Sequence, residues 1–233
     1  MLNPTPFFAP DYFATRDVTL PRLQKFSVDV IQRLAADNPG QVFDALVADL
    51  QAFHTALFGA VGSVDQGISQ RRTAAQQMWG AVADLQHQLA EDEALIEYKS
   101  KKTPALHQAF FPNGRSEYTN ATLLTAELLL TRAATAAATH AKTLGADFDP
   151  APYAGFLQAF RDGRDGTGAG DQQSAHARAE AQHHRQDLTQ RLTDAAKLVA
   201  AHWLRDEARA AAYFRFDLLQ APTPATTPRP AAG

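Results

Sequence analysis

The sequence contains no cysteine among its 233 residues. This absence excludes disulfides, zinc sites with thiolate ligands and cysteine nucleophiles within the chain. Neither sign of charge dominates, because the formal net charge is −3 at pH 7. A chain without a strong basic field is not expected to bind nucleic acid or an anionic membrane as its main partner.

Long uninterrupted apolar runs are absent as well. The most apolar stretch, residues 45–64, contains Asp49, Gln51 and His54, so we interpret it as a core helix and expect no stable membrane span. Prolines interrupt the first 13 residues and the first basic residue is Arg16, so we expect no cleaved signal peptide. The predicted location is the cytoplasm, or export without a cleaved signal peptide.

Hydrophobic residues make up 45% of the chain, which is enough for a sizeable core. Alanine dominates this fraction while valine, isoleucine, tyrosine and tryptophan are few, so the composition favours helix over strand. The composition is also rich in alanine and arginine and poor in lysine, which is typical of bacterial proteins. We therefore predict an all-α protein.

Apolar residues recur at helical spacing in six segments, most of which begin at a capping residue or a proline. These segments are residues 19–36, 39–59, 63–101, 120–145, 150–160 and 171–214. Two interruptions are predicted: an apolar turn over residues 58–62 and a flexible glycine-rich loop over residues 161–170. The apolar turn suggests a membrane-active helical protein as one alternative function.

The two halves of the chain resemble each other. Residues 50–53 match residues 157–160 at a separation of 107, residues 73–76 match 179–182 at 106, and the aromatic pairs at 110–111 and 213–214 lie 103 apart. Such a pattern predicts an elongated bundle of about six helices, built from two tandem repeats of roughly 105 residues with two long helices antiparallel or side by side.

The predicted organisation has four parts. They are an extended N-terminal arm over residues 1–18, a first helical repeat over 19–112, a second over 113–219, and a disordered Pro/Ala/Thr tail over 220–233.

Histidine and carboxylate residues cluster at helical spacing in the second half. Glu180 is followed by His183 and His184 three and four residues later, and His87 lies on the long helix of the first half. Paired helices that offer carboxylate and imidazole together hold the metal in di-iron bundles, so a metal-binding, di-iron-like bundle is an alternative. The surrounding segment is polar on nearly every face, however, which is also typical of a solvated helix.

No Ser-His-Asp, H-E-x-x-H or EF-hand pattern is present, and the glycine-rich segment has no phosphate-binding signature. We therefore predict no cofactor and leave an enzymatic activity uncertain but less favoured. The leading hypothesis is a non-enzymatic helical bundle with a structural or adaptor role, which contacts a protein partner or a second copy of itself. The expected contact residues are Phe7, Phe8, Phe110, Phe111, Arg115, Glu117 and Tyr118, with Arg115, Glu117 and Tyr118 forming the exposed part of a turn.

Overall fold

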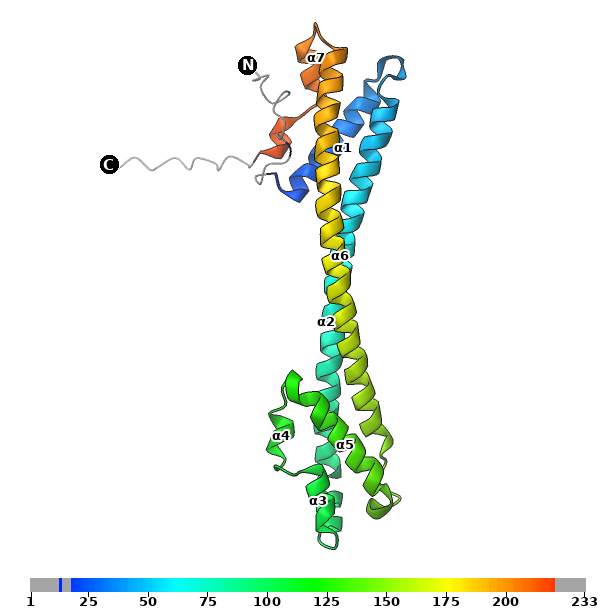
Figure 1. The fold of residues 1–233 in the computed structure, drawn as a ribbon, viewed down its shortest axis with the longest axis vertical. Coiled ribbons are helices and arrows are strands. Elements are labelled where there is room, and N and C mark those ends of the chain that lie inside the picture. Colours follow the sequence, from blue (N-terminus) through cyan, green and yellow to red (C-terminus); the bar gives the residue numbers. More distant parts are fainter. Residues whose placement is uncertain (1–12, 14–17, 221–233) are drawn as a thin grey trace, which may run out of the picture. The chain divides into compact units, whose positions relative to one another are not determined.

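The computed structural model describes Phe13 and residues 18–220. Most of the predicted N-terminal arm and of the predicted tail therefore lies outside the described residues. The described part is all-helical and contains no strand, which confirms the predicted class. Its elements are α1 (Leu20–Ala36), η2 (Pro39–Gln41), α2 (Asp44–Ser100), α3 (Pro104–Phe110), α4 (Ser116–Thr119), α5 (Leu123–Leu144), α6 (Ala151–His202), α7 (Glu207–Ala212) and η3 (Phe216–Leu219) (Figure 1).

Two of these helices are long, as predicted: α2 has 57 residues and α6 has 52. The two predicted interruptions were wrong, because residues 58–62 and 161–170 are both helical. A glycine in a helix costs only about 1 kcal/mol relative to alanine, so packing of the whole helix can offset it. The apolar turn that suggested a membrane-active protein is therefore absent.

The starts of both long helices follow the capping signals of the sequence. The side chain of Asn38 accepts a hydrogen bond from Phe43 N at 2.9 Å, and that of Asp149 accepts one from Ala151 N at 2.9 Å. Helix α2 begins at Asp44, after the short 3-10 helix η2, and not at Pro39. The carboxylate and amide groups satisfy backbone donors that a helix start would otherwise leave unpaired.

The chain forms two compact units, and each contains parts of both long helices. Unit 1 is described over Phe13, residues 18–63 and residues 176–220; unit 2 consists of residues 64–175. The boundaries of the units cut across the predicted repeats, because those repeats are consecutive stretches of sequence. Each unit is thus built from both halves of the chain.

In unit 1, α1 and α7 pack on the first part of α2 and the last part of α6. The two long helices are antiparallel here, since the Phe43 ring lies 5.3 Å from that of His202 and Asp49 pairs with Arg191. Apolar side chains from all of these elements, including Leu23, Phe26, Leu34, Leu50, Leu57, Leu188, Leu192, Val199 and Tyr213, form one core. Burial of these side chains holds unit 1 together.

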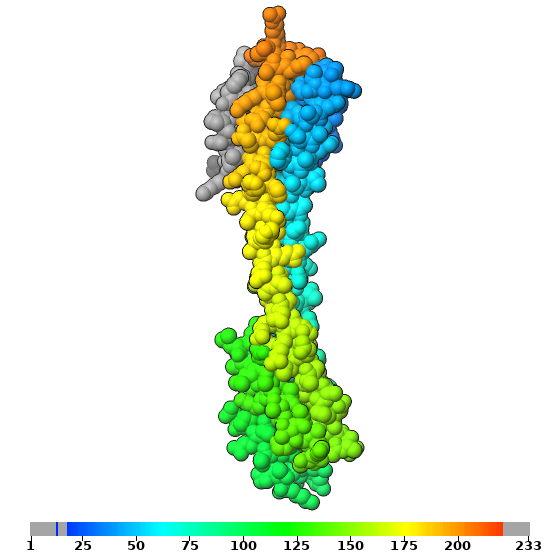
Figure 2. Space-filling model, turned by 45° about the vertical axis from the view of Figure 1, so that its right-hand side comes forward, coloured from blue at the N-terminus to red at the C-terminus, as the bar shows by residue number. Residues whose placement is uncertain are grey.

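In unit 2, α3, α4 and α5 lie along the last part of α2 and the first part of α6 (Figure 1). Its core combines leucines and isoleucine with an aromatic cluster, and includes Leu85, Leu89, Ile96, Leu106, Phe110, Phe111, Tyr118, Leu130, Phe148, Tyr153 and Phe160. The side chains of α3, α4 and α5 (green) form a continuous surface with the start of α6 in the space-filling view (Figure 2). This surface carries the candidate site.

Many buried positions in the two halves are related by one separation, 103 residues, although Phe43 and Leu46 are buried where Ala146 and Asp149 are exposed. The pairs include Leu23 and Ala126, Phe26 and Leu129, Val30 and Ala133, Leu34 and Ala137, Leu50 and Tyr153, Leu57 and Phe160, Leu85 and Leu188, Leu89 and Leu192, Ile96 and Val199, and Phe110 and Tyr213. The starts of α1 and α5, and those of α3 and α7, are also 103 residues apart. Positions related by this separation are called equivalent below.

Candidate interaction surface

Helix α5 is fixed at its first turn by a capping box. Thr122 N donates to Thr125 Oγ1 at 3.0 Å, and the two hydroxyl groups lie 3.2 Å apart. One face of the helix is buried in unit 2 through Ala126, Leu129, Leu130, Ala133, Ala136, Ala137 and Leu144. This buried face determines which residues of α5 point away from the core.

The opposite face of α5 carries a second row of uncharged residues, which we call the outer stripe. It consists of Leu124, Leu128, Thr131, Thr135 and Ala138, at alternating intervals of four and three residues. Leu124 is 95% exposed and Leu128 is 62% exposed. Alternating intervals of four and three residues align side chains along one face of a helix, as in the seam of a coiled coil.

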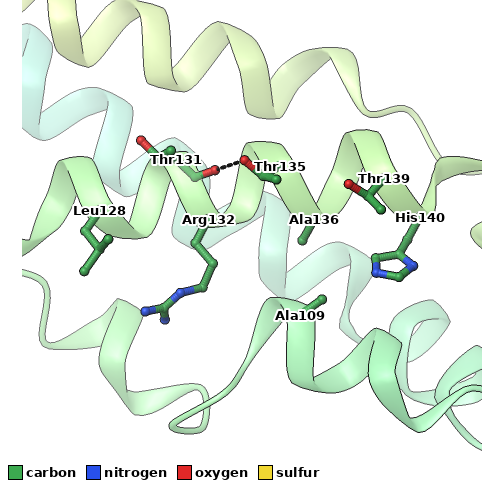
Figure 3. A pocket seen from close by; sticks show the side chains of 8 residues that line it. All are labelled: Ala109, Leu128, Thr131, Arg132, Thr135, Ala136, Thr139 and His140. Carbon is green, nitrogen blue, oxygen red and sulfur yellow. Dashed lines mark hydrogen bonds between the residues drawn. The ribbon is translucent and has the colours of Figure 1, made fainter.

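A groove of about 400 Å³ runs beside the outer stripe, between α5 and α3. It is lined by Ala109 of α3 and by Leu128, Thr131, Arg132, Thr135, Ala136, Thr139 and His140 of α5. Figure 3 shows Leu128, Arg132, Ala136 and His140 extending from α5 on the side of Ala109, with the three threonines in the neighbouring row. The lining is therefore mostly apolar or hydroxyl-bearing.

Arg132 is the one permanently charged residue in this lining, and a carboxylate neutralises it. Its Nη1 lies 2.6 Å from Glu117 Oε1. Burial alone would raise the pKa of Glu117, but hydrogen bonds from Arg132 and Asn113 outweigh burial and lower it. The hydrogen bond to Glu117 raises the pKa of Arg132. Both groups stay charged and compensate each other, so the groove has no net permanent charge.

The equivalent face of α1 in unit 1 is different. Lys25 is equivalent to Leu128, and Arg33 is equivalent to Ala136. The Arg33 side chain pairs with Asp29 at 2.7 Å and donates from Nη1 to the carbonyl oxygen of Ala212 at 2.9 Å. It thereby bridges α1 and α7. Because α5 has an alanine at the equivalent position, the corresponding space between α5 and α3 is open.

Three of the predicted contact residues belong to the core of unit 2. Phe110, Phe111 and Tyr118 are all buried, and Tyr118 Oη donates to the carbonyl oxygen of Phe110 at 2.7 Å. Burial raises the pKa of the Tyr118 hydroxyl to about 12. The two phenylalanines pack in the core, and Tyr118 is not part of the predicted exposed turn. These three rings pack beneath the surface formed by α3, α4 and α5 and are too buried to contact a partner.

The remaining predicted contact residues are placed as follows. Arg115 is half-exposed and pairs with Glu93 of α2, while Glu117 pairs with Arg132. Arg115 therefore ties the start of α4 to α2, and Glu117 ties α4 to α5. Phe7 and Phe8 lie outside the described residues.

The predicted metal ligands are on different units. Glu180, His183 and His184 are in unit 1 and His87 is in unit 2. His183 and His184 both face Asp187, at 3.5 and 3.8 Å, and Glu180 pairs with His176 at 3.4 Å. Within the described part of the chain, no group of three or more His, Cys, Asp or Glu side chains is arranged to hold a metal ion.

The outer stripe was not predicted from the sequence, although the sequence contains a signal for it. Leu123, Leu124, Leu128, Leu129 and Leu130 are five leucines within eight positions of one helix. Successive residues of a helix are about 100° apart, so this set covers more than one face and cannot all be buried on one side. The leucines that do not fit on the buried face could therefore have predicted an exposed apolar surface on this helix.

Comparison of the chain with models of known protein families, with curated proteins and with solved structures gives no match. Among the described helices, α2 alone is long and apolar enough to pass a test for a membrane span, and 22% of its most apolar window is buried. Core helices of water-soluble proteins, which are mostly buried, and signal sequences meet the same criteria of length and composition.

Proposed function

We propose that this chain is a non-enzymatic helical protein that acts through protein–protein interaction or self-assembly, with the outer stripe of α5 as its contact surface. The observation that carries the proposal is the exposure of Leu124 and Leu128 beside a groove without net permanent charge. Exposed leucines that adjoin a groove are typical of docking surfaces, because isolated chains rarely expose contiguous apolar patches without a use for them.

The comparison between units supports the proposal. Folding of the equivalent helix α1 does not require leucine at these positions, since α1 has Pro21 and Lys25 there. The open groove is not required either, because Arg33 bridges the equivalent space. The apolar surface of α5 is thus a property of one unit and not of the shared architecture, which favours a specific contact.

The composition of the groove also supports a binding role over catalysis. Its only permanently charged side chain, Arg132, is occupied by an ion pair with Glu117. General acid–base catalysis uses a titratable side chain beside the reacting atom, and His140 is the one such side chain of this lining besides the paired Arg132. Threonine hydroxyls, alanines and a leucine are better suited to contact a protein surface.

We also infer that the chain consists of two tandem copies of one helical unit, at a separation of 103 residues. The support is the coincidence of buried positions at this single separation, without insertions between the start of α1 and Tyr213. Helices of medium, long and short length follow each other twice in the same order. A duplicated chain can keep one copy's surface polar while the other acquires a contact function.

Site-specific photo-crosslinking tests the proposed contact function. A photoreactive amino acid replaces Leu128 in one variant and the equivalent Lys25 of α1 in another, and both proteins are irradiated in the cells that produce them. We expect covalent adducts with protein at position 128 and far fewer at position 25. Circular dichroism confirms that both variants are folded. Equal or absent adducts at the two positions would contradict the proposal.

A further inference from the structure

We propose that the partner of the outer stripe is the outer stripe of a second copy of this chain, with the two α5 helices antiparallel. This inference rests on the proposed contact function and goes beyond it by naming the partner and its orientation. Three properties of the described surface carry it: the order of side-chain sizes along the stripe, the position of the groove, and the distribution of charge.

Side-chain size decreases along the outer stripe. Leu124 and Leu128 are at its N-terminal end, Thr131 is in the middle, and Thr135 and Ala138 are at its C-terminal end. Antiparallel pairing about Thr131 places Leu124 opposite Ala138 of the second copy and Leu128 opposite its Thr135. Each large side chain then meets a small one. Parallel pairing would crowd four leucines at one end and leave the other end poorly packed.

The groove lies where antiparallel pairing needs space. Its lining includes Thr135, Ala136, Thr139 and His140 at the C-terminal part of α5, together with Ala109 of α3. The leucines of a second, antiparallel α5 lie over this part of the helix. A groove of about 400 Å³ exceeds the volume of a leucine side chain, so each copy can receive the leucines of the other. Both copies use the same surface, as a twofold contact requires.

Charge is distributed as a self-contact requires. Near a twofold axis each residue approaches its own copy, so any unpaired charge there meets a like charge. The outer stripe has no charged residue, and Arg132 beside it is neutralised by Glu117. The equivalent face of α1 carries Lys25, Asp29 and Arg33 and would not suit such a contact.

The size of the surface implies a weak dimer. Stable protein interfaces bury about 800 Å² per partner, and five residues on one helix with the rim of α3 provide less than this. The dimer is therefore expected to depend on concentration and to dissociate on dilution. A covalent readout is suited to a contact of this kind.

Single cysteines provide the test, because the natural chain contains none and each variant carries a single thiol. Thr131→Cys places the thiol near the twofold axis, at a half-buried position, and Val28→Cys places one at the equivalent position of α1, which is exposed. Under mild oxidation we expect about tenfold more disulfide-linked dimer from Thr131→Cys than from Val28→Cys, because proximity raises the effective concentration of the thiols. Equal yields from the two variants would overturn the proposal.

Orientation is tested with two further variants. A mixture of Leu124→Cys and Ala138→Cys proteins should form the mixed dimer in preference to either homodimer. Preferential self-linking of Leu124→Cys would show a parallel contact and overturn the antiparallel one. Photo-adducts at position 128 that contain a different protein, without Thr131→Cys dimers, would overturn self-association but leave the proposed contact function standing. Loss of both signals would overturn both.

Discussion

The backbones of Gly67 on α2 and Gly170 on α6 approach each other closely in unit 2. A Cβ atom added at Gly67 would lie 3.0 Å from the carbonyl oxygen of Gly170, and one added at Gly170 would lie 2.8 Å from that of Gly67. The two glycines occupy equivalent positions in the two halves of the chain. At each of them the methyl group of an alanine would collide with the backbone of the other helix.

This contact predicts that Gly67→Ala lowers stability. Alanine favours the helix by up to about 1 kcal/mol over glycine, but the forced separation of two backbones costs about 1–3 kcal/mol, so the net change is a loss. Gly80 of α2 has no atom within 4 Å of an added Cβ. We therefore expect Gly80→Ala to raise the free energy of unfolding in urea. A gain in stability for both variants would contradict the close approach.

The proposed tandem duplication predicts matched effects at equivalent core positions. Leu85 in unit 2 and Leu188 in unit 1 are both buried. Each leucine-to-alanine substitution should lower the free energy of unfolding by about 2–5 kcal/mol, because it removes apolar contacts and leaves a cavity. Leu198→Ala, at an exposed position of α6, serves as the control and should cost much less. A large loss at only one of the two core positions would count against equivalence.

Substitution of Leu128 by lysine copies the residue that α1 carries at the equivalent position. Because Leu128 is exposed, Leu128→Lys should change the free energy of unfolding by no more than about 0.5 kcal/mol. The same charge should abolish association, since it would be desolvated in the contact. Sedimentation velocity over a range of concentrations measures association, with Leu198→Lys as the matched exposed control. Undiminished association of the Leu128 variant would place the contact elsewhere.

The stability of unit 1 should depend on the protonation of His54. Its Nδ1 lies 2.8 Å from the buried Ser27 Oγ, which itself donates to the carbonyl oxygen of Gln24 at 3.0 Å. Which of the two groups donates in the Ser27–His54 contact depends on the tautomer of the histidine. Burial lowers the pKa of His54 below its ordinary value of 6.5.

A lowered histidine pKa means that the unfolded chain takes up the proton more readily than the folded one. The contribution of neutral His54 to the free energy of unfolding is therefore complete above pH 6.5. It is lost as the pH falls through 6.5 towards the lower pKa that His54 has in the folded chain. Urea unfolding on both sides of this pH measures the loss. The variant His54→Gln should show a smaller decrease on acidification than the natural chain, and an identical decrease would exclude His54 as the cause.

The metal-binding alternative has a direct measurement. Protein purified without a histidine tag should contain less than about a tenth of an equivalent of iron, manganese or zinc, because no three of the described His and carboxylate side chains are arranged to hold a metal ion. A stoichiometric amount of metal that disappears in a His183→Ala/His184→Ala variant would instead establish a metal site on α6.

Much of the helical organisation follows from local sequence. Thr122, Asn38 and Asp149 are short polar residues that accept backbone donors at helix starts, and each helix begins within a few residues of them. These features depend on neighbours within a few residues, so the sequence contains them directly.

Continuity of the long helices depended on contacts distant in sequence. Residues 161–170 have a loop-like composition, yet they are helical. Gly163, Gly166 and Gly170 lie against α2, where an added Cβ would come within about 3 Å of its atoms. Close packing of the two helices compensates for the poor helix propensity of glycine. A prediction from local propensity does not include contacts between residues distant in sequence.

By itself, the sequence determined the helical class and the approximate positions at which α1, α2, α5 and α6 begin, because propensity and capping act over a few residues. Only the tertiary structure decided that each compact unit combines both halves of the chain and that Leu124 and Leu128 remain exposed. The physical reason is that burial depends on which helices become neighbours. The apolar row of α5 that found no neighbour within unit 2 is the surface through which we expect the chain to act.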